Sequence, residues 1–133
     1  MVLPDEKLLD VVKSLDLSVV KARLMRESCW DETRANTAVT EYKRFLIMSK
    51  LSDAGATVKP CKDVDEVWHT HILFTRMYHR DCETVFGRYL HHTPEAEDSD
   101  EVVSLKHYET TLKNYESLFL QPAPEMWTQS QSE

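Results

Sequence analysis

The chain has 133 residues, 41% of them hydrophobic and 29% charged, which is typical of one globular domain and excludes wholesale disorder. Two glycines and five prolines are too few for the many tight turns of a β-sandwich or small barrel, so helices are favoured. The 23 acidic and 16 basic residues give a net charge of −7. We expect no nucleic-acid partner, because neutralising phosphates needs a positive surface.

The sequence shows no secretion signal and no membrane span. The first six residues contain no basic segment followed by an apolar stretch, and the longest apolar runs are only a few residues. The cysteines Cys29, Cys61 and Cys82 are widely spaced, form no CxxC pair and give no disulfide framework. We therefore expect a cytoplasmic protein with no membrane partner.

Apolar residues at helical spacing predict three helices in the first half of the chain. Pro4 followed by two acids indicates the start of the first helix. A second helix is expected from Ser18 to about residue 25. A third begins after Asp31, the candidate cap, and carries an apolar stripe to Leu51. A break over 27–31 is expected between the second and third helices, although one continuous helix also fits the pattern.

The second half of the chain predicts two further helices. The fourth is expected from Asp63 to Phe86 as the long central helix, with Asp63 and Glu66 as a capping-box-like pair. Gly87 suits the left-handed position that ends a helix. The fifth follows a loop in which residues 95–101 hold five acids.

These elements predict an all-α fold, a compact bundle of about five helices in a single domain over residues 1–120. Residues 121–133 are expected to form a mobile polar tail. Within that tail, Met126 and Trp127 either fold back onto the domain or offer a short partner-binding segment. We favour the first alternative, because a lone tryptophan usually finds an apolar surface.

The most informative pattern is the WHTH motif at residues 68–71 of the expected central helix. On a helical wheel His71 lies in the middle of the core-facing stripe, whereas His69 lies with Asp65 on a polar flank. The two histidines therefore cannot hold one ion from a regular helix, because residues i and i+2 point to different faces. Asp65 and His69, at i and i+4, have three interpretations: they bind a metal jointly, the carboxylate orients the imidazole, or they form an ordinary exposed pair.

The role of His71 has two interpretations. It is either a buried histidine with a hydrogen-bond partner such as Tyr78, or a metal ligand or acid–base group inside the bundle. The twin His91-His92 follows in the loop after the central helix, and five of the six histidines fall between residues 69 and 92. Zinc prefers His and Cys ligands and tolerates a carboxylate, although this spacing matches no standard zinc signature. We expect one site that joins helix and loop, with metal-ligand candidates Asp65, His69, His71, His91 and His92.

Residues 30–94 resemble the N-terminal module of the glycine-rich domain-containing proteins. The resemblance rests on D-x-x-W-H-x-H at 65–71 and on L-H-H-x-P at 90–94. It implies that one shared pattern contains Asp65, Trp68, His69, His71, Cys82, His91 and His92. That module has no assigned activity, so the resemblance implies a shared site without a mechanism. The glycine-rich tail of longer members is absent from this chain, which has two glycines.

Together these patterns predict a small intracellular helical domain with a His-rich site that binds a transition metal such as zinc. Its chemistry would use a metal-bound water or a His–Asp pair as general base on a small substrate, with catalytic candidates Asp65, His69, His71 and Tyr78. One alternative is a protein-interaction module in which the histidines are structural and binding uses the acidic loop or the Met126-Trp127 segment. Another is a metal-free small-molecule isomerase or cyclase that uses His69 or His71 with Tyr78 in a bundle pocket.

Overall fold

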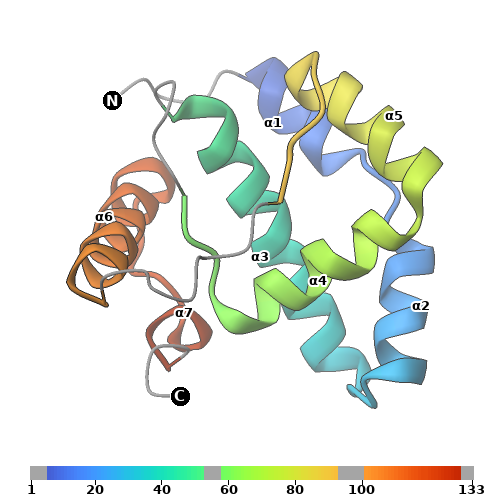
Figure 1. Cartoon of the computed structure of the whole chain (residues 1–133), viewed down its shortest axis with the longest axis horizontal. Helices are drawn as coiled ribbons and strands as arrows, with labels where there is room; N and C mark the ends of the chain where they lie inside the picture. Colours follow the sequence, from blue (N-terminus) through green and yellow to red (C-terminus); the bar gives the residue numbers. More distant parts are fainter. Residues whose placement is uncertain (1–5, 53–57, 93–100, 130–133) are drawn as a thin grey trace.

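The computed structural model describes residues 6–52, 58–92 and 101–129, and these contain seven helices and no strand. The expected all-α fold is confirmed for these residues, with two helices more than the sequence indicated. Figure 1 shows their arrangement. In chain order the helices are α1 (Glu6–Lys13), α2 (Ser18–Glu27), α3 (Glu32–Leu51), α4 (Lys62–Leu73), α5 (Thr75–Phe86), α6 (Glu101–Phe119) and α7 (Glu125–Gln129).

Helix α3 packs against α1, α2, α4 and α6. The expected break before it is confirmed, because Cys29 adopts a left-handed φ of 58° between α2 and α3. The carboxylate of Asp31 then caps α3 by accepting a hydrogen bond from the backbone N–H of Arg34 at 2.8 Å. The predicted apolar stripe supplies much of the core, with buried side chains at Ala35, Ala38, Tyr42, Phe45 and Leu46.

The expected cap of the next helix is wrong. Helix α4 begins at Lys62, and its N-cap residue Cys61 makes no side-chain capping bond. Asp63 lies in the first turn, where its carboxylate accepts two hydrogen bonds, at 2.9 and 3.0 Å, from the guanidinium of Arg34 on α3. A bidentate hydrogen bond to a guanidinium is stronger than a hydrogen bond from one backbone N–H. The Asp63 carboxylate therefore binds Arg34 and does not cap the helix, although the local pattern predicts that it would.

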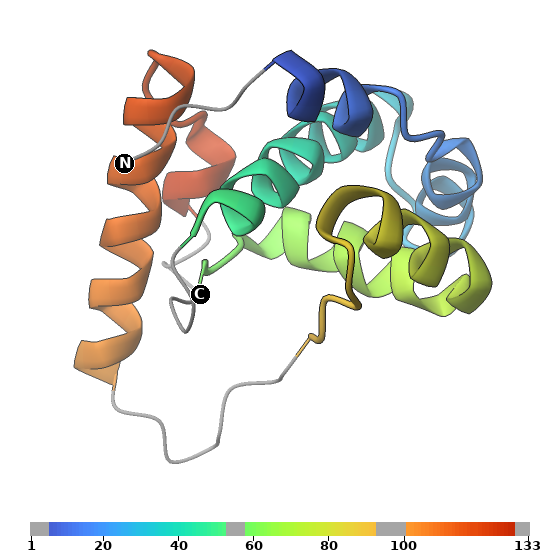
Figure 2. The ribbon, with the colours of Figure 1, turned by 90° about the horizontal axis from the view of Figure 1, so that it is seen from above.

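The expected long central helix carrying the WHxH motif is also wrong, because the chain turns at Phe74 and divides it into α4 and α5. Figure 2 shows the two helices meeting at a corner. In a straight helix, residues ten apart are separated by about 15 Å. Here Trp68 Nε1 donates to Tyr78 Oη at 2.8 Å, and His71 Nε2 lies 2.9 Å from Asp81 Oδ2. These two contacts, each between residues ten apart, therefore hold α4 and α5 together at the turn.

The C-terminal helices α6 and α7 are joined to α3 by one buried carboxylate. Glu41 accepts hydrogen bonds from the hydroxyl of Tyr115 at 2.6 Å and from Nε1 of Trp127 at 2.9 Å, and Arg44 lies 3.3 Å away. Trp127 is fully buried and Met126 packs against the core. Of the two alternatives for Met126 and Trp127, the structure shows the one in which they fold back onto the domain. They do so in helix α7, which lies inside the expected tail.

None of the described helices combines the length and the apolarity that crossing a membrane requires. Residues 95–100 of the acidic loop lie outside the described part of the chain.

Candidate metal centre

Three of the five candidate ligands come together on the outer face of α4. Asp65 and His69 lie one turn apart on this helix, and His92 reaches them from the segment that follows α5. Asp65 Oδ1 is 2.7 Å from His92 Nε2, and Asp65 Oδ2 is 3.7 Å from His69 Nε2. One ligand atom from each residue lies within 4.8 Å of the other two. Helix and loop therefore contribute to one cluster, the Asp65–His69–His92 cluster.

The path of the chain after α5 explains how His92 reaches α4. Gly87 ends α5 with a left-handed φ of 71°, as predicted, and reverses the chain. The backbone of Leu90 is then held on both sides, because its carbonyl accepts a hydrogen bond from the hydroxyl of Tyr78 and its N–H donates to Cys82 Sγ at 3.5 Å. These two side chains of α5 hold the segment that carries His92 next to α4.

The imidazole of His92 is further oriented by ring stacking. It stacks on the indole of Trp68, with centroids 3.9 Å apart, and on the imidazole of His69, with centroids 4.4 Å apart. Trp68 is in turn held by its hydrogen bond to Tyr78. The His92 side chain is 16% exposed, whereas those of Asp65 and His69 are 35% and 53% exposed. One candidate ligand is thus fixed and covered, and the other two face solvent.

The chemistry of the Asp65–His69–His92 cluster fits a transition metal. Two imidazoles and one carboxylate are ligands that zinc and other borderline metals accept, and catalytic zinc sites use three such ligands. In a tetrahedral zinc site the ligand atoms lie about 3.4 Å apart, given metal–nitrogen bonds of about 2.1 Å. The 3.7 Å separation between Asp65 and His69 is close to this value. Asp65 Oδ1 and His92 Nε2, 2.7 Å apart, are at hydrogen-bond distance, so a shared ion would replace that hydrogen bond.

His71 lies in a different environment, inside the core. The residue is 1% exposed, its Nδ1 is 2.7 Å from the hydroxyl of Tyr42, and its Nε2 is 2.9 Å from Asp81 Oδ2. Because a carboxylate accepts, Nε2 carries the proton and Nδ1 accepts from Tyr42. Burial lowers the pKa of His71, and the hydrogen bond to Asp81 opposes this shift in part. Both ring nitrogens are therefore occupied, and His71 does not join the cluster.

This arrangement corresponds to the buried-histidine interpretation, with partners that sequence reasoning missed. Tyr78, the expected partner, makes an edge contact with the His71 ring at a centroid distance of 4.9 Å. Tyr42 lies on the predicted apolar stripe of α3, and nothing in that pattern indicated that its hydroxyl would bind His71. Asp81 is ten residues from His71, so only the corner at Phe74 brings the two together.

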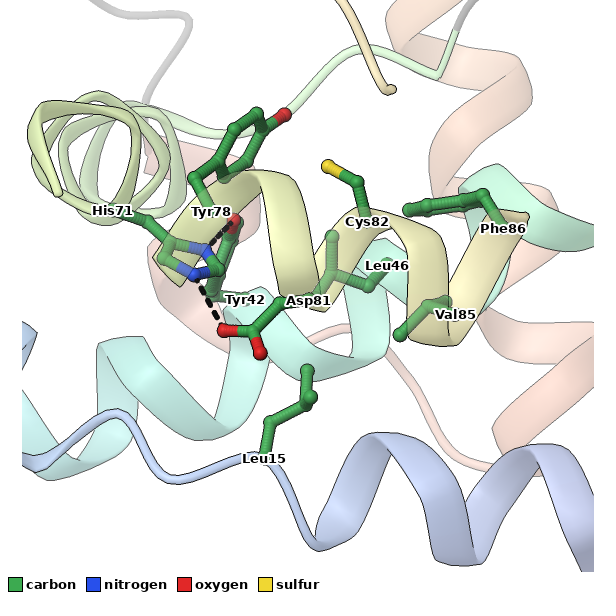
Figure 3. A pocket seen from close by; sticks show the side chains of 9 residues that line it. All are labelled: Leu15, Tyr42, Leu46, His71, Tyr78, Asp81, Cys82, Val85 and Phe86. Atoms are coloured by element: carbon green, nitrogen blue, oxygen red, sulfur yellow. Dashed lines mark hydrogen bonds and ion pairs between the residues drawn. The ribbon is translucent and has the colours of Figure 1, made fainter. Parts of the chain in front are cut away.

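A cavity of about 10 Å³ lies beside His71 and holds about one water molecule at most. Figure 3 shows its lining: Leu15, Tyr42, Leu46, His71, Tyr78, Asp81, Cys82, Val85 and Phe86. Burial also raises the pKa of Tyr78, so its hydroxyl stays protonated. His71 and Tyr78 thus lie in a packed core with no room for a substrate there, which argues against the isomerase or cyclase interpretation at these two residues.

His91, the remaining candidate ligand, is exposed and lies apart from the cluster. Its ring contacts that of Tyr89, with centroids 4.8 Å apart, and Tyr89 also contacts His79 on α5. Among the described residues, the group of His, Cys and acidic side chains close enough to share an ion is Asp65, His69 and His92.

Comparisons with known proteins identify a family. A family model described as UCP032817-like matches residues 12–115, which include the whole cluster and the Tyr42–His71–Asp81 network. No curated protein matches the chain, and no solved structure matches it. The resemblance to the glycine-rich domain-containing proteins is therefore wrong. Its motifs are short, and they lie inside a region that the UCP032817-like model matches over most of the chain. The chain belongs to the UCP032817-like family.

Proposed function

We propose that this protein binds a divalent transition metal, most simply zinc, through Asp65, His69 and His92. The observation that carries the proposal is the convergence of these three side chains from segments 27 residues apart, with His92 held 2.7 Å from Asp65. Because imidazole and carboxylate together suit zinc and similar ions, this donor set favours such a metal over calcium or magnesium.

The position of His69 distinguishes this cluster from a simple ion pair. A hydrogen bond from His92 to Asp65 accounts for two of the residues. The third, His69, has its Nε2 3.7 Å from the carboxylate, which is too long for a hydrogen bond. His69 stacks on His92 instead, and this places one of its ring nitrogens within 4.8 Å of the other two candidate ligand atoms.

The neighbours of the cluster support the proposal. Trp68 stacks on His92, and Tyr78 holds both Trp68 and the backbone of Leu90. Residues that orient metal ligands in this way raise affinity, because the ligands do not need to be ordered on binding. Any chemistry on a small substrate would then take place at this exposed cluster, where a metal-bound water is the candidate general base.

Elemental analysis and zinc titration test the proposal. The full chain, purified without a tag or chelator, is expected to bind one equivalent of zinc, measured by mass spectrometry of the metal and by calorimetry. His69→Ala and His92→Ala are each expected to lose this binding. His79→Ala is the matched control, since His79 is an exposed histidine outside the cluster, and it is expected to retain one equivalent.

The opposite result is equally clear. If the protein contains no ion, shows no heat on zinc addition and melts at an unchanged temperature, the metal proposal is wrong. The protein-interaction alternative then becomes the better hypothesis.

A further inference from the structure

Within the described part of the chain, the Asp65–His69–His92 cluster supplies three candidate ligands, and the other two candidate histidines are engaged elsewhere. The nitrogens of His71 are occupied by Tyr42 and Asp81 inside the core. The ring of His91 lies against Tyr89. Structural zinc sites have four protein ligands, whereas sites with three protein ligands keep a position for water or substrate.

The three ligands also leave one side of the cluster accessible. His92 is covered, because it lies against the indole of Trp68. The side chains of Asp65 and His69 on α4 are 35% and 53% exposed, so both face solvent. The helix fixes these two residues one turn apart, and the contacts of Leu90 fix the backbone that precedes His92.

Charge indicates which kind of molecule would occupy the open position. A divalent ion bound by one carboxylate and two neutral imidazoles keeps one net positive charge. The ion's own charge is then the largest in the site and favours an anionic ligand. The chain as a whole is acidic, with a net charge of −7, and therefore repels anions in general. An anion would bind here only by coordinating the metal ion directly.

We propose that the ion held by Asp65, His69 and His92 keeps an open coordination position that takes a small oxygen monoanion of the carboxylate type. This inference rests on the proposed metal binding and goes beyond it. It identifies the site as one that binds an external ligand, in contrast to an ion that only stabilises the fold.

Cobalt(II) provides the experiment, because its visible absorption reports the number and type of its ligands. The metal-free full chain is loaded with one equivalent of cobalt(II) and titrated with acetate at constant pH. A saturable change in the visible band is expected. A pH titration without acetate distinguishes hydroxide, formed from bound water, from the carboxylate. The variant His91→Ala is the control, and it is expected to give the same band and the same acetate affinity as the parent chain.

Each outcome has a defined meaning. A cobalt band that acetate leaves unchanged overturns the inference, whether or not it changes with pH, while leaving metal binding intact. A weaker or altered band in His91→Ala also overturns it, because His91 would then be a fourth ligand closing the site. If no cobalt band forms and zinc does not bind, the metal proposal itself is wrong, and this inference is wrong with it.

Discussion

His69 and His71 are separated by a single residue of α4, yet the structure places them in opposite environments. His71 is 1% exposed and has both ring nitrogens bound, by Tyr42 from α3 and by Asp81 from α5. His69 is about half-exposed, and its Nε2 lies 3.7 Å from the carboxylate of Asp65. The same residue type therefore stabilises the core in one position and is available to a ligand in the other.

The comparison shows that the partners of a histidine, more than its presence in a motif, determine what it does. On a helix, side chains two residues apart point about 200° apart around the axis, so neighbouring histidines meet different parts of the protein. A histidine enclosed by an acceptor and a donor has no lone pair left for a metal. The following predictions test this contrast between His71 and His69, starting with the largest expected effect.

Removal of the buried imidazole is expected to affect stability most. In His71→Ala the carboxylate of Asp81 and the hydroxyl of Tyr42 lose their partner inside the core. We expect the free energy of unfolding to fall by about 2–5 kcal/mol, measured by urea denaturation of the metal-free protein. His69→Ala, the matched surface variant, is expected to change it by less than about 0.5 kcal/mol. Equal losses in the two variants would contradict the comparison.

Zinc is expected to stabilise the protein through the surface cluster. At a free zinc concentration about 100 times the dissociation constant, the free energy of unfolding is expected to rise by about 2.7 kcal/mol. The melting temperature, followed by circular dichroism, should rise with zinc and return to its original value on adding a chelator. His92→Ala is expected to abolish the rise and His79→Ala to preserve it. A rise of the same size in His92→Ala would show that zinc acts elsewhere.

The hydroxyl of Tyr78 is expected to link the core to the cluster. Tyr78→Phe keeps the ring but removes the oxygen that accepts from Trp68 Nε1 and donates to the carbonyl of Leu90. We expect a loss of about 1–2 kcal/mol in stability, because the indole N–H loses its partner. Zinc affinity is expected to fall about tenfold, because His92 is less well oriented. The zinc affinity is measured by calorimetry, with Tyr89→Phe as the control. A zinc affinity in Tyr78→Phe equal to that of the parent chain would limit Tyr78 to a structural role.

The dependence of stability on pH provides the finest test. Burial lowers the pKa of His71 below its ordinary value of 6.5, while Asp81 raises it in part and nearby Arg80 lowers it further. Below pH 6.5 the unfolded chain therefore binds a proton that the folded chain does not, and stability falls as pH falls. The contribution of the neutral, buried His71 to the free energy of unfolding is fully present above pH 6.5.

The variant His71→Gln isolates this effect, because an amide does not titrate. Urea denaturation of the metal-free chain between pH 7.5 and 5 is expected to show a shallower loss of stability in His71→Gln than in the parent chain. An identical pH dependence in the two proteins would mean that His71 does not titrate differently in the folded and unfolded states.

Much of the helical structure was predictable from local patterns. Asp31 caps α3 and Gly87 ends α5, because capping and left-handed conformations depend on the residue and its close neighbours. The separation of His69 from His71 also followed from helical geometry alone. The turn at Phe74 was not predictable, because the segment around it contains no glycine or proline and its apolar spacing continues through the corner.

The cluster was predictable in part. Periodicity placed Asp65 and His69 together, and the position of His91-His92 after Gly87 indicated that a loop imidazole returns to the helix. Which of the two returns was not visible in the sequence, because it depends on the stacking of His92 on Trp68 and of His91 near Tyr89. The family was misidentified because the resemblance rested on short motifs, which carry less information than a match over residues 12–115.

Local residue order was enough to establish that this is an all-helical chain whose α4 has a polar face and a core face, since helix spacing and capping act over only a few residues. The pairing of His71 with Tyr42 and Asp81, the burial of Trp127 against Glu41 and the approach of His92 to Asp65 all join residues at least ten positions apart. Such contacts depend on how the helices pack, and packing depends on the fit of the whole core, which no local pattern records.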